Sequence, residues 1–197
     1  MASNLVNKLE EFGITVISLQ PTSGPELYPY WNILGLISGY HREASQMSEI
    51  FQQRLAELSR KVDSVPLSSR PQVYFEAIHS RMKTFSPQAI AMFCLESAGG
   101  INVAADAVPR NNTNIASYGK ERILSHAQTI DVYLAQSGRM NRITVDDIVS
   151  ESGFAAIKAI SNKRVYLIEE NLVSRPTSRL IEGMWQINRL LFQTMIN

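Results

Sequence analysis

The sequence contains a single cysteine among its 197 residues, Cys94. An intramolecular disulfide is therefore impossible, and a metal cluster held by several cysteine thiolates is excluded. Cys94 lies in the apolar run 89–95, which indicates a small buried hydrophobic side chain. One cysteine does not identify the redox compartment, because exported bacterial proteins often contain none.

Long apolar segments are missing as well. No run of apolar residues approaches the roughly 20 that are needed to span a bilayer. Residues 1–8 contain no basic segment followed by an apolar one, so we expect no export signal in the chain as given. On this pattern the chain is either cytosolic or a processed or shortened piece.

A strong charge of either sign is also absent. Lysine and arginine number 19 against 18 aspartate and glutamate residues, a formal charge of +1, so no overall field would gather nucleic acid or an anionic membrane. Hydrophobic residues make up 45% and charged residues 19% of the chain, which is typical of a globular protein with a packed core. The length suits one large domain, or one full domain plus a fragment of another.

The common catalytic and metal-binding signatures do not occur. The sequence contains no G-x-S-x-G, Walker A, G-x-G-x-x-G, C-x-x-C or H-E-x-x-H motif. His41, His79 and His126 are far apart, so we interpret them as surface or helix-terminal residues rather than metal ligands. The acidic pairs 146–147 and 169–170 are adjacent and share no face, which indicates a solvated edge. We therefore expect neither an enzyme nor a metal site.

What is present is an alternation of helices and strands. Apolar residues at helical spacing predict an amphipathic helix of about six turns over 41–62, and Leu180, Met184, Ile187 and Leu191 predict the buried stripe of a terminal helix. Further helices are expected at 4–12, 26–36, 87–98 and 120–127, and after a capping box at 144–147; strands are expected at 14–19, 73–78, 130–135 and 164–168. This order predicts an α/β fold with a mostly parallel sheet flanked by helices.

Residues that follow the predicted strands are the candidate binding residues. Ligands of open α/β sheets bind beyond the carboxyl ends of the strands. The polar residues at that edge are Glu76, His79, Ser137, Arg139, Asn171, Arg175 and Arg179, with Tyr118 in a separate loop that could reach it. Because loops are polar whether or not they bind anything, a solvated loop residue is the favoured interpretation of any single one of these side chains.

Six segments of the chain match the motifs of one protein family in register. Residues 95–104, LESAGGINVA, are similar to an "aGGxNvA" turn, and the other matches follow in the family's order: 9–16 (LEEFGITV), 34–39 (LGLISG), 70–76 (RPQVYFE), 156–166 (AIKAISNKRVY) and 175–180 (RPTSRL). In these segments the chain resembles the substrate-binding proteins of ABC importers for siderophores, haem and cobalamin.

The resemblance implies the C-terminal lobe of a two-lobed protein. It divides the chain into a remnant of the N-terminal lobe at 1–39, an interlobe backbone helix at 40–65 and a C-terminal α/β lobe at 66–197. The segment 63–71, with two prolines and three serines, marks the expected boundary. Family members begin with a complete first lobe that supplies half of the cleft, so we expect most of that lobe to be missing here.

The resemblance also implies a function without catalysis. Such a protein binds a ferric chelate, haem or a corrinoid on the periplasmic or extracellular face of the membrane, has no resident cofactor, and docks on an ABC permease. Family members contact the ligand through aromatic and basic groups, and on this basis Glu76, Tyr118 and Arg175 are the expected ligand-binding residues. The family's docking acid opens a helix in "sxEqiL", which places Glu121 of 120–124 (KERIL) at that position. A glutamate in a first helical turn is also favoured by the helix dipole, so both explanations of Glu121 stay open.

Two alternative functions remain. An orphan strand and an aromatic surface left by a missing lobe invite association, so the chain could be a non-transporting interaction protein that forms a homo-oligomer through its N-terminal remnant. An enzyme on the related two-lobed metallocluster scaffold is disfavoured, because a single cysteine cannot build the cluster site.

Overall fold

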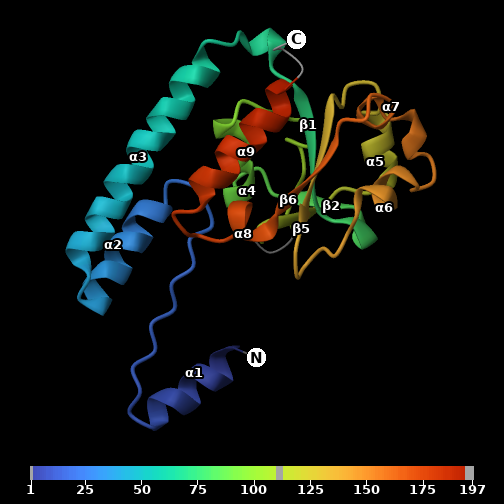
Figure 1. The fold of residues 1–197 in the computed structure, drawn as a ribbon. Coiled ribbons are helices and arrows are strands. Elements are labelled where there is room, and N and C mark those ends of the chain that lie inside the picture. The colour runs from blue at the N-terminus through green and yellow to red at the C-terminus, as the bar shows by residue number, and fades with distance from the viewer. Residues whose placement is uncertain (1, 110–112, 194–197) are drawn as a thin grey trace.

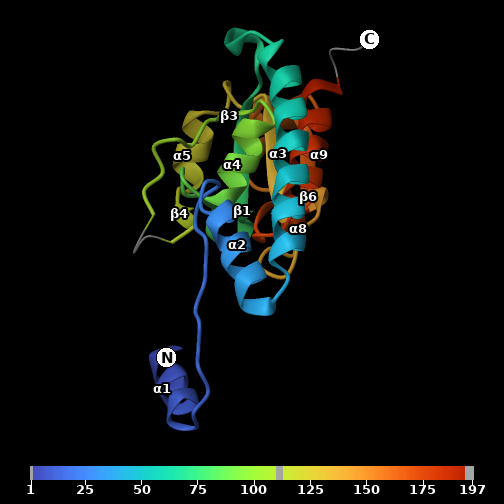
Figure 2. The same cartoon turned by 90° about the vertical axis from the view of Figure 1, so that its left-hand side faces the viewer.

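The computed structural model describes residues 2–109 and 113–193. It opens with three helices, α1 (Ala2–Glu11), α2 (Leu27–Ser38) and α3 (His41–Asp63). Figures 1 and 2 show α1 standing apart from the rest, joined to α2 by an extended segment. The prediction of a strand at 14–19 is wrong, because among the described residues this segment pairs with no strand and its backbone makes no sheet hydrogen bonds.

The helices α2 and α3 pack together through an aromatic cluster. The rings of Trp31 and Phe51 meet edge-on at 5.1 Å between centroids, and Tyr28 packs against both. The indole Nε1 of Trp31 donates a hydrogen bond to the carbonyl oxygen of Pro176 at 2.9 Å. This bond connects the N-terminal helices to the loop that precedes the last helix.

The sheet has six strands in the described part of the chain. They are β1 (Gln72–Ile78), β2 (Lys83–Phe85), β3 (Ile101–Asn102), β4 (Ile115–Ser117), β5 (Val132–Ser137) and β6 (Val165–Glu169). The order is β4-β2-β1-β5-β6, with β3 also on β1. The pairs β1–β3, β1–β5 and β5–β6 are parallel, whereas β2 runs antiparallel to β1 and β4. The predicted α/β fold is confirmed, but the antiparallel edge was not foreseen.

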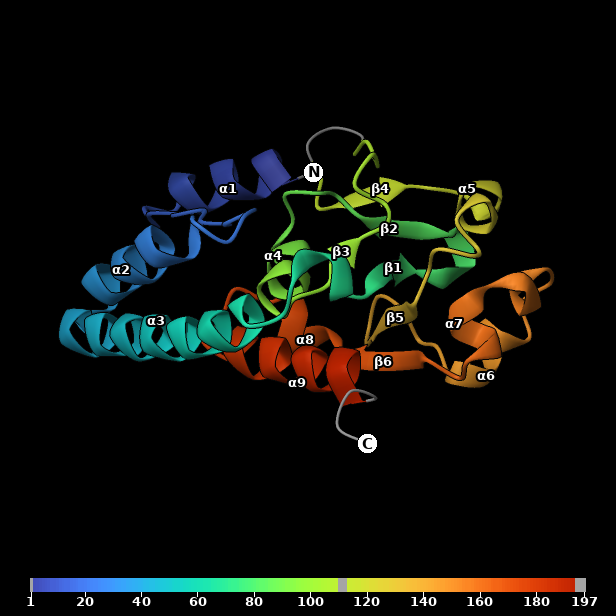
Figure 3. The same ribbon diagram turned by 90° about the horizontal axis from the view of Figure 1, so that it is seen from above.

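Helices cover both faces of this sheet, as Figure 3 shows from above. One core lies between the sheet and α3, α4 (Ile90–Ser97), α8 (Glu170–Val173) and α9 (Leu180–Phe192). The other lies under α5 (Lys120–Ser125), α6 (Val145–Val149) and α7 (Lys158–Ser161). Short 3-10 helices occur at Leu67–Ser69, His79–Arg81 and Phe154–Ala156.

The predicted details of three helices can be compared with the structure. The stripe of α9 is confirmed, since Leu180, Met184, Ile187 and Leu191 are all buried. The capping box is confirmed too, because the Thr144 hydroxyl accepts from the amide of Asp147, whose carboxylate accepts from the amide of Thr144. The helix expected from residue 87 instead begins at Ile90, after a turn in which the Ala89 amide donates to the Ser86 carbonyl.

Across residues 2–109 and 113–193, no helix combines the length and apolar character required to cross a membrane. The division into segments 1–39, 40–65 and 66–197 stays a prediction, and its outer segments include residues that lie outside the described ones. The structure shows that the N-terminal part of α3 packs beside α2 and that its C-terminal end leads toward the sheet (Figure 1).

Candidate functional site

A depression of about 690 Å³ lies at the carboxyl ends of the central strands. Ile78 of β1 and Gln136 of β5 line it at the strand ends. Glu170 lines it directly after β6, and Ser174 and Arg175 line it after the short helix α8 that follows β6. The opposite wall comes from β2 and β4, and the N-terminal segment contributes a rim; these residues are Lys83, Phe85, Ile115, Gln20 and Thr22. The depression therefore occupies the edge at which open α/β sheets bind ligands.

Arg175 presents a positive charge to this depression. Its guanidinium lies 2.6 Å from the carboxylate of Glu170, which is buried, while Arg175 itself is half-exposed. Glu170 also accepts a hydrogen bond from the backbone amide of Met140 at 3.1 Å. The buried carboxylate of Glu170, with its two donors, thus holds the guanidinium of Arg175 at the lining of the depression.

The burial of Glu170 corrects the interpretation of the acidic pair 169–170 as a solvated edge. Glu169 is exposed at the end of β6, but Glu170 turns inward at the start of α8. Its space is created by Gly138, where an added Cβ would lie 2.6 Å from Glu170 side-chain atoms. The partners that make burial possible come from two loops, and no sequence pattern links them.

Gln136 joins the strand ends and was not singled out from the sequence. Its amide nitrogen donates to the carbonyl of Ala77 at 3.0 Å, and its amide oxygen accepts from the hydroxyl of Ser174 at 2.7 Å. Asn141 donates to the Gln136 carbonyl at 2.9 Å. These bonds fix β1, β5 and the loop before Arg175 relative to one another. Gln136 follows the predicted strand 130–135, so the rule on strand ends could have identified it.

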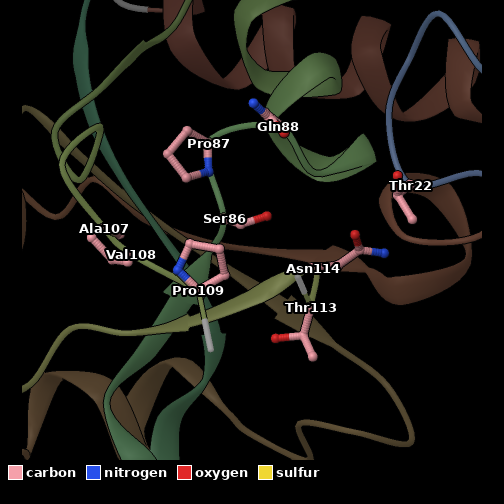
Figure 4. A pocket seen from close by; sticks show the side chains of 9 residues that line it. All are labelled: Thr22, Ser86, Pro87, Gln88, Ala107, Val108, Pro109, Thr113 and Asn114. Carbon is pink, nitrogen blue, oxygen red and sulfur yellow. The ribbon is translucent and has the colours of Figure 1, made fainter. Parts of the chain in front are cut away.

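A second depression, of about 570 Å³, adjoins the first and shares Thr22, Thr113 and Asn114 with it. Figure 4 shows the hydroxyl of Ser86 and the amide of Asn114 between the rings of Pro87 and Pro109 and the side chain of Thr22. The Ser86 amide donates to the Asn114 carbonyl at 2.9 Å, which holds the segment before α4 against the approach to β4. The two depressions are therefore adjacent and meet at their shared lining residues.

Glu76 does not line this surface. It has no exposed area and lies with Tyr74 and Tyr133 on the other face of the sheet. Its Oε2 accepts a hydrogen bond from the Tyr133 hydroxyl at 2.5 Å and lies 2.9 Å from Nδ1 of His79. Burial, and then the Glu76 charge, hold the pKa of Tyr133 well above its usual range.

His79 connects Glu76 to a second acidic residue. The hydrogen bond to Glu76 is the main cause that raises the pKa of His79, and Glu151, 3.6 Å from Nε2, acts in the same direction. Glu151 in turn pairs with Lys120 at 2.5 Å, which lowers the pKa of Glu151. The four residues form a chain of charges that fastens the end of β1 to the start of α5.

Tyr118 is buried and lies away from the depressions. Its ring packs 5.8 Å from that of Tyr74, and the guanidinium of Arg122 covers it at 4.3 Å from the centroid. Burial raises the pKa of its phenol. Of the three expected ligand-binding residues, the structure brings Arg175 to the strand-end depression and holds Glu76 and Tyr118 in the interior.

Glu121 lies in the first turn of α5, and its side chain is exposed. The preceding Gly119 has a φ of 90°, a left-handed conformation that suits glycine. Both proposed roles of Glu121, docking and helix stabilisation, are compatible with this position. Among the described residues, no group of three His, Cys, Asp or Glu side chains is arranged to hold a metal ion.

No family model matches the chain. The chain is 21% identical over 193 residues to the uncharacterized ABC transporter substrate-binding lipoprotein YvrC of Bacillus subtilis. The match covers 97% of this chain and 58% of that protein. It is also 23% identical over 192 residues to the cobalamin-binding protein of Halobacterium salinarum, a match that covers 97% of this chain and 51% of that protein. The chain thus spans about half the length of the curated relatives it matches.

Solved structures show the same fold. The molybdate periplasmic binding protein MolA of Haemophilus influenzae superposes with a TM-score of 0.80 at 16% identity, over 98% of this chain and 63% of that one. The vitamin B12 binding protein BtuF of Vibrio cholerae superposes with a TM-score of 0.71 at 18% identity, over 99% of this chain and 71% of that one. The chain therefore has the fold of the periplasmic solute-binding proteins, and its homologues are substrate-binding proteins of ABC importers, which are not enzymes.

Proposed function

We propose that the chain is a substrate-binding component of an ABC-type uptake system, and that the strand-end depression is its contribution to the ligand site. The observation that carries this proposal is the position of Arg175, which a buried carboxylate orients toward a depression at the carboxyl ends of parallel strands. A volume of about 690 Å³ falls within the range of small-molecule sites.

The proposed ligand is a metal chelate that carries anionic oxygens, such as a ferric siderophore, or haem or a corrinoid. Lys83 and Arg175 place two cations around the depression, and Glu170 neutralises only part of that charge. Phe85 and Ile115 supply apolar surface for a ring system beside them. The names of the similar proteins, which include binders of cobalamin, iron and molybdate, support a metal-containing ligand.

The proposed partner is the permease of the importer, on the periplasmic or extracellular face of the membrane. The similar proteins are periplasmic or lipoprotein components, which supports this location. Glu121 is the proposed docking residue, since its side chain is exposed in the first turn of α5. Charge reversal by Glu121→Lys should abolish uptake through the cognate permease in reconstituted vesicles while leaving ligand titration unchanged.

Spectral titration of the chain with haem, cyanocobalamin and a ferric hydroxamate tests the ligand class. Saturable binding of one of them is expected, and Arg175→Ala should weaken it about tenfold or more, because a charge-assisted contact is lost. Arg179→Ala is the matched control, since that half-exposed arginine pairs with Glu182 and does not line the depression.

Removal of Arg175 leaves Glu170 buried without its cation, so folding must be checked by circular dichroism. Arg175→Lys keeps the charge but loses the planar fork, and should give an intermediate affinity. The proposal is wrong if all three probes fail to saturate, or if the folded Arg175→Ala protein binds as tightly as the parent chain.

A further inference from the structure

The segment that leads into α4 carries a buried hydroxyl group without a partner. Ser86 has only 5% of its surface exposed, and its hydroxyl makes no hydrogen bond with the described residues. Figure 4 shows this hydroxyl pointing into the depression of about 570 Å³, on the side of Asn114. Because buried polar groups in folded proteins are hydrogen-bonded, an unpaired hydroxyl at the wall of a depression indicates that a bound molecule supplies the partner.

The N-terminus of α4 adds further donors beside this hydroxyl. Ala89, the residue before the helix, provides no side-chain cap, and the amides of Ile90 and Ala91 donate to no acceptor among the described residues. The amides of a first helical turn point out of the N-terminal end, where the helix dipole also places partial positive charge. The start of α4 therefore directs free donors toward the segment 86–88, which lines the depression.

Asn114 lies against the same segment from the approach to β4. Its backbone carbonyl accepts from the Ser86 amide at 2.9 Å, and its side-chain amide lines the depression. Thr22 lines it too, but its amide and its hydroxyl already donate to the carboxylate of Glu26. Among the described residues that line this depression, every polar side chain is uncharged.

We propose that Ser86, Asn114 and the free end of α4 form a subsite for an oxyanion group of the ligand, such as a carboxylate or a phosphate. Such a group accepts several hydrogen bonds at once, and a helix N-terminus binds it without a cationic side chain. Arg175 lines the adjoining depression, and the two depressions share Asn114. The ligand expected from this pair of subsites, which rests on the proposed function, carries anionic oxygens at two separated positions.

Titration with inorganic sulfate tests the subsite without any uptake ligand. In NMR spectra that resolve the backbone amides, the signals of Ile90 and Ala91 should shift saturably with sulfate, but not with chloride at equal ionic strength. Ser86→Ala should weaken this binding about tenfold, because a hydrogen bond to a charged group is lost. Asn114→Asp should abolish it, because a carboxylate then replaces the donor amide and repels the anion.

Stability separates a binding role of Ser86 from a structural one. Its hydroxyl has no partner among the described residues, so Ser86→Ala should leave the free energy of unfolding in urea unchanged while the sulfate affinity falls. Ser125→Ala is the matched control, because that hydroxyl donates to the carbonyl of Arg122 on α5, away from both depressions. A loss of stability in Ser86→Ala with unchanged sulfate affinity would assign the hydroxyl to the fold and overturn the proposal.

Failure of the subsite is distinguishable from failure of the proposed function. The subsite is wrong if sulfate leaves the Ile90 and Ala91 amides unmoved, or shifts them equally in Ser86→Ala and Asn114→Asp, which would mark an adventitious ion only. Saturable binding of haem, cyanocobalamin or a ferric hydroxamate without the sulfate response would overturn the subsite alone. The sulfate response without binding of those three would support the subsite and overturn the uptake function.

Discussion

The Nδ1 atom of His79 lies 2.9 Å from a carboxylate oxygen of Glu76, a residue with no exposed surface. The pair closes the end of β1, and Glu151 approaches the other ring nitrogen at 3.6 Å. Lys120 and Asp147 complete the charged surroundings of the imidazole, from α5 and α6 respectively. The two carboxylates stabilise the charged form of His79 more than the neutral imidazole.

Stability should therefore depend on the protonation of His79. Its pKa is raised in the folded state, chiefly by Glu76, so its contribution is fully present below the unfolded value of about 6.5 and is lost as the pH rises through the folded pKa. Urea unfolding across this range should show the parent chain losing stability with rising pH relative to His79→Gln. Parallel pH profiles for the two proteins would contradict the assignment.

The close approach of α8 and α9 should make Gly183→Ala strongly destabilising. A Cβ at this position would lie 2.0 Å from the backbone oxygen of Leu172, which cannot move without displacing α8. Overpacking of this kind costs about 1–3 kcal/mol or more in the free energy of unfolding, measured by urea denaturation. Glu182→Ala is the control, because Glu182 is the exposed neighbour of Gly183 in α9. It should change the free energy of unfolding by at most about 0.5 kcal/mol, as is typical of surface sites.

Gly138→Ala should weaken ligand binding through Arg175. The added methyl would lie 2.6 Å from Glu170, which must then shift together with the guanidinium that it orients. Gly138 thus acts as a positioning residue, and its substitution should lower affinity in the spectral titration while circular dichroism stays native. Unchanged affinity would show that the ligand does not use the orientation of Arg175. Adding Arg175→Ala separates the two effects, since the second substitution should then cost little further affinity.

The capping box at the start of α6 should contribute measurable stability. Thr144→Ala removes an acceptor for the Asp147 amide and should lower the free energy of unfolding by about 1 kcal/mol. Asp146→Ala is the control, because this exposed residue lies in the same turn outside the reciprocal bonds. Equal losses for the two variants would indicate a general helix-dipole effect instead of a specific cap.

The sequence predicted the elements whose side-chain pattern is long enough to repeat. The helix expected at 41–62 is α3, His41–Asp63, and the strand at 73–78 is β1. The strands β2 and β4 have three residues each, which is too short for an alternation to be visible. The segment 14–19 has the composition of a strand, but strand formation requires a neighbour, and composition cannot supply one.

The candidate site was predicted in part. Arg175 follows β6 at the sheet edge, as the rule on strand ends requires. Glu76 follows Tyr74 by two residues in β1, and successive side chains of a strand point to opposite faces of the sheet. Its side chain therefore shares the face of Tyr74 and not that of Phe75 and Ala77. The roles of Glu170 and Gln136 depend on contacts between loops distant in the sequence, which no local pattern encodes.

The hydrogen bond from Trp31 to Pro176 connects α2 to the loop that carries Arg175, the residue proposed to contact the ligand. Pro176 directly follows Arg175, so a movement of that loop changes the polar environment of the indole. Trp185, one of the chain's 2 tryptophans, lies under Lys61 beside the opposite end of α3. If the proposed ligand binds at Arg175, the tryptophan fluorescence of a Trp185→Phe variant, which then comes from Trp31 alone, should change on titration without any added label.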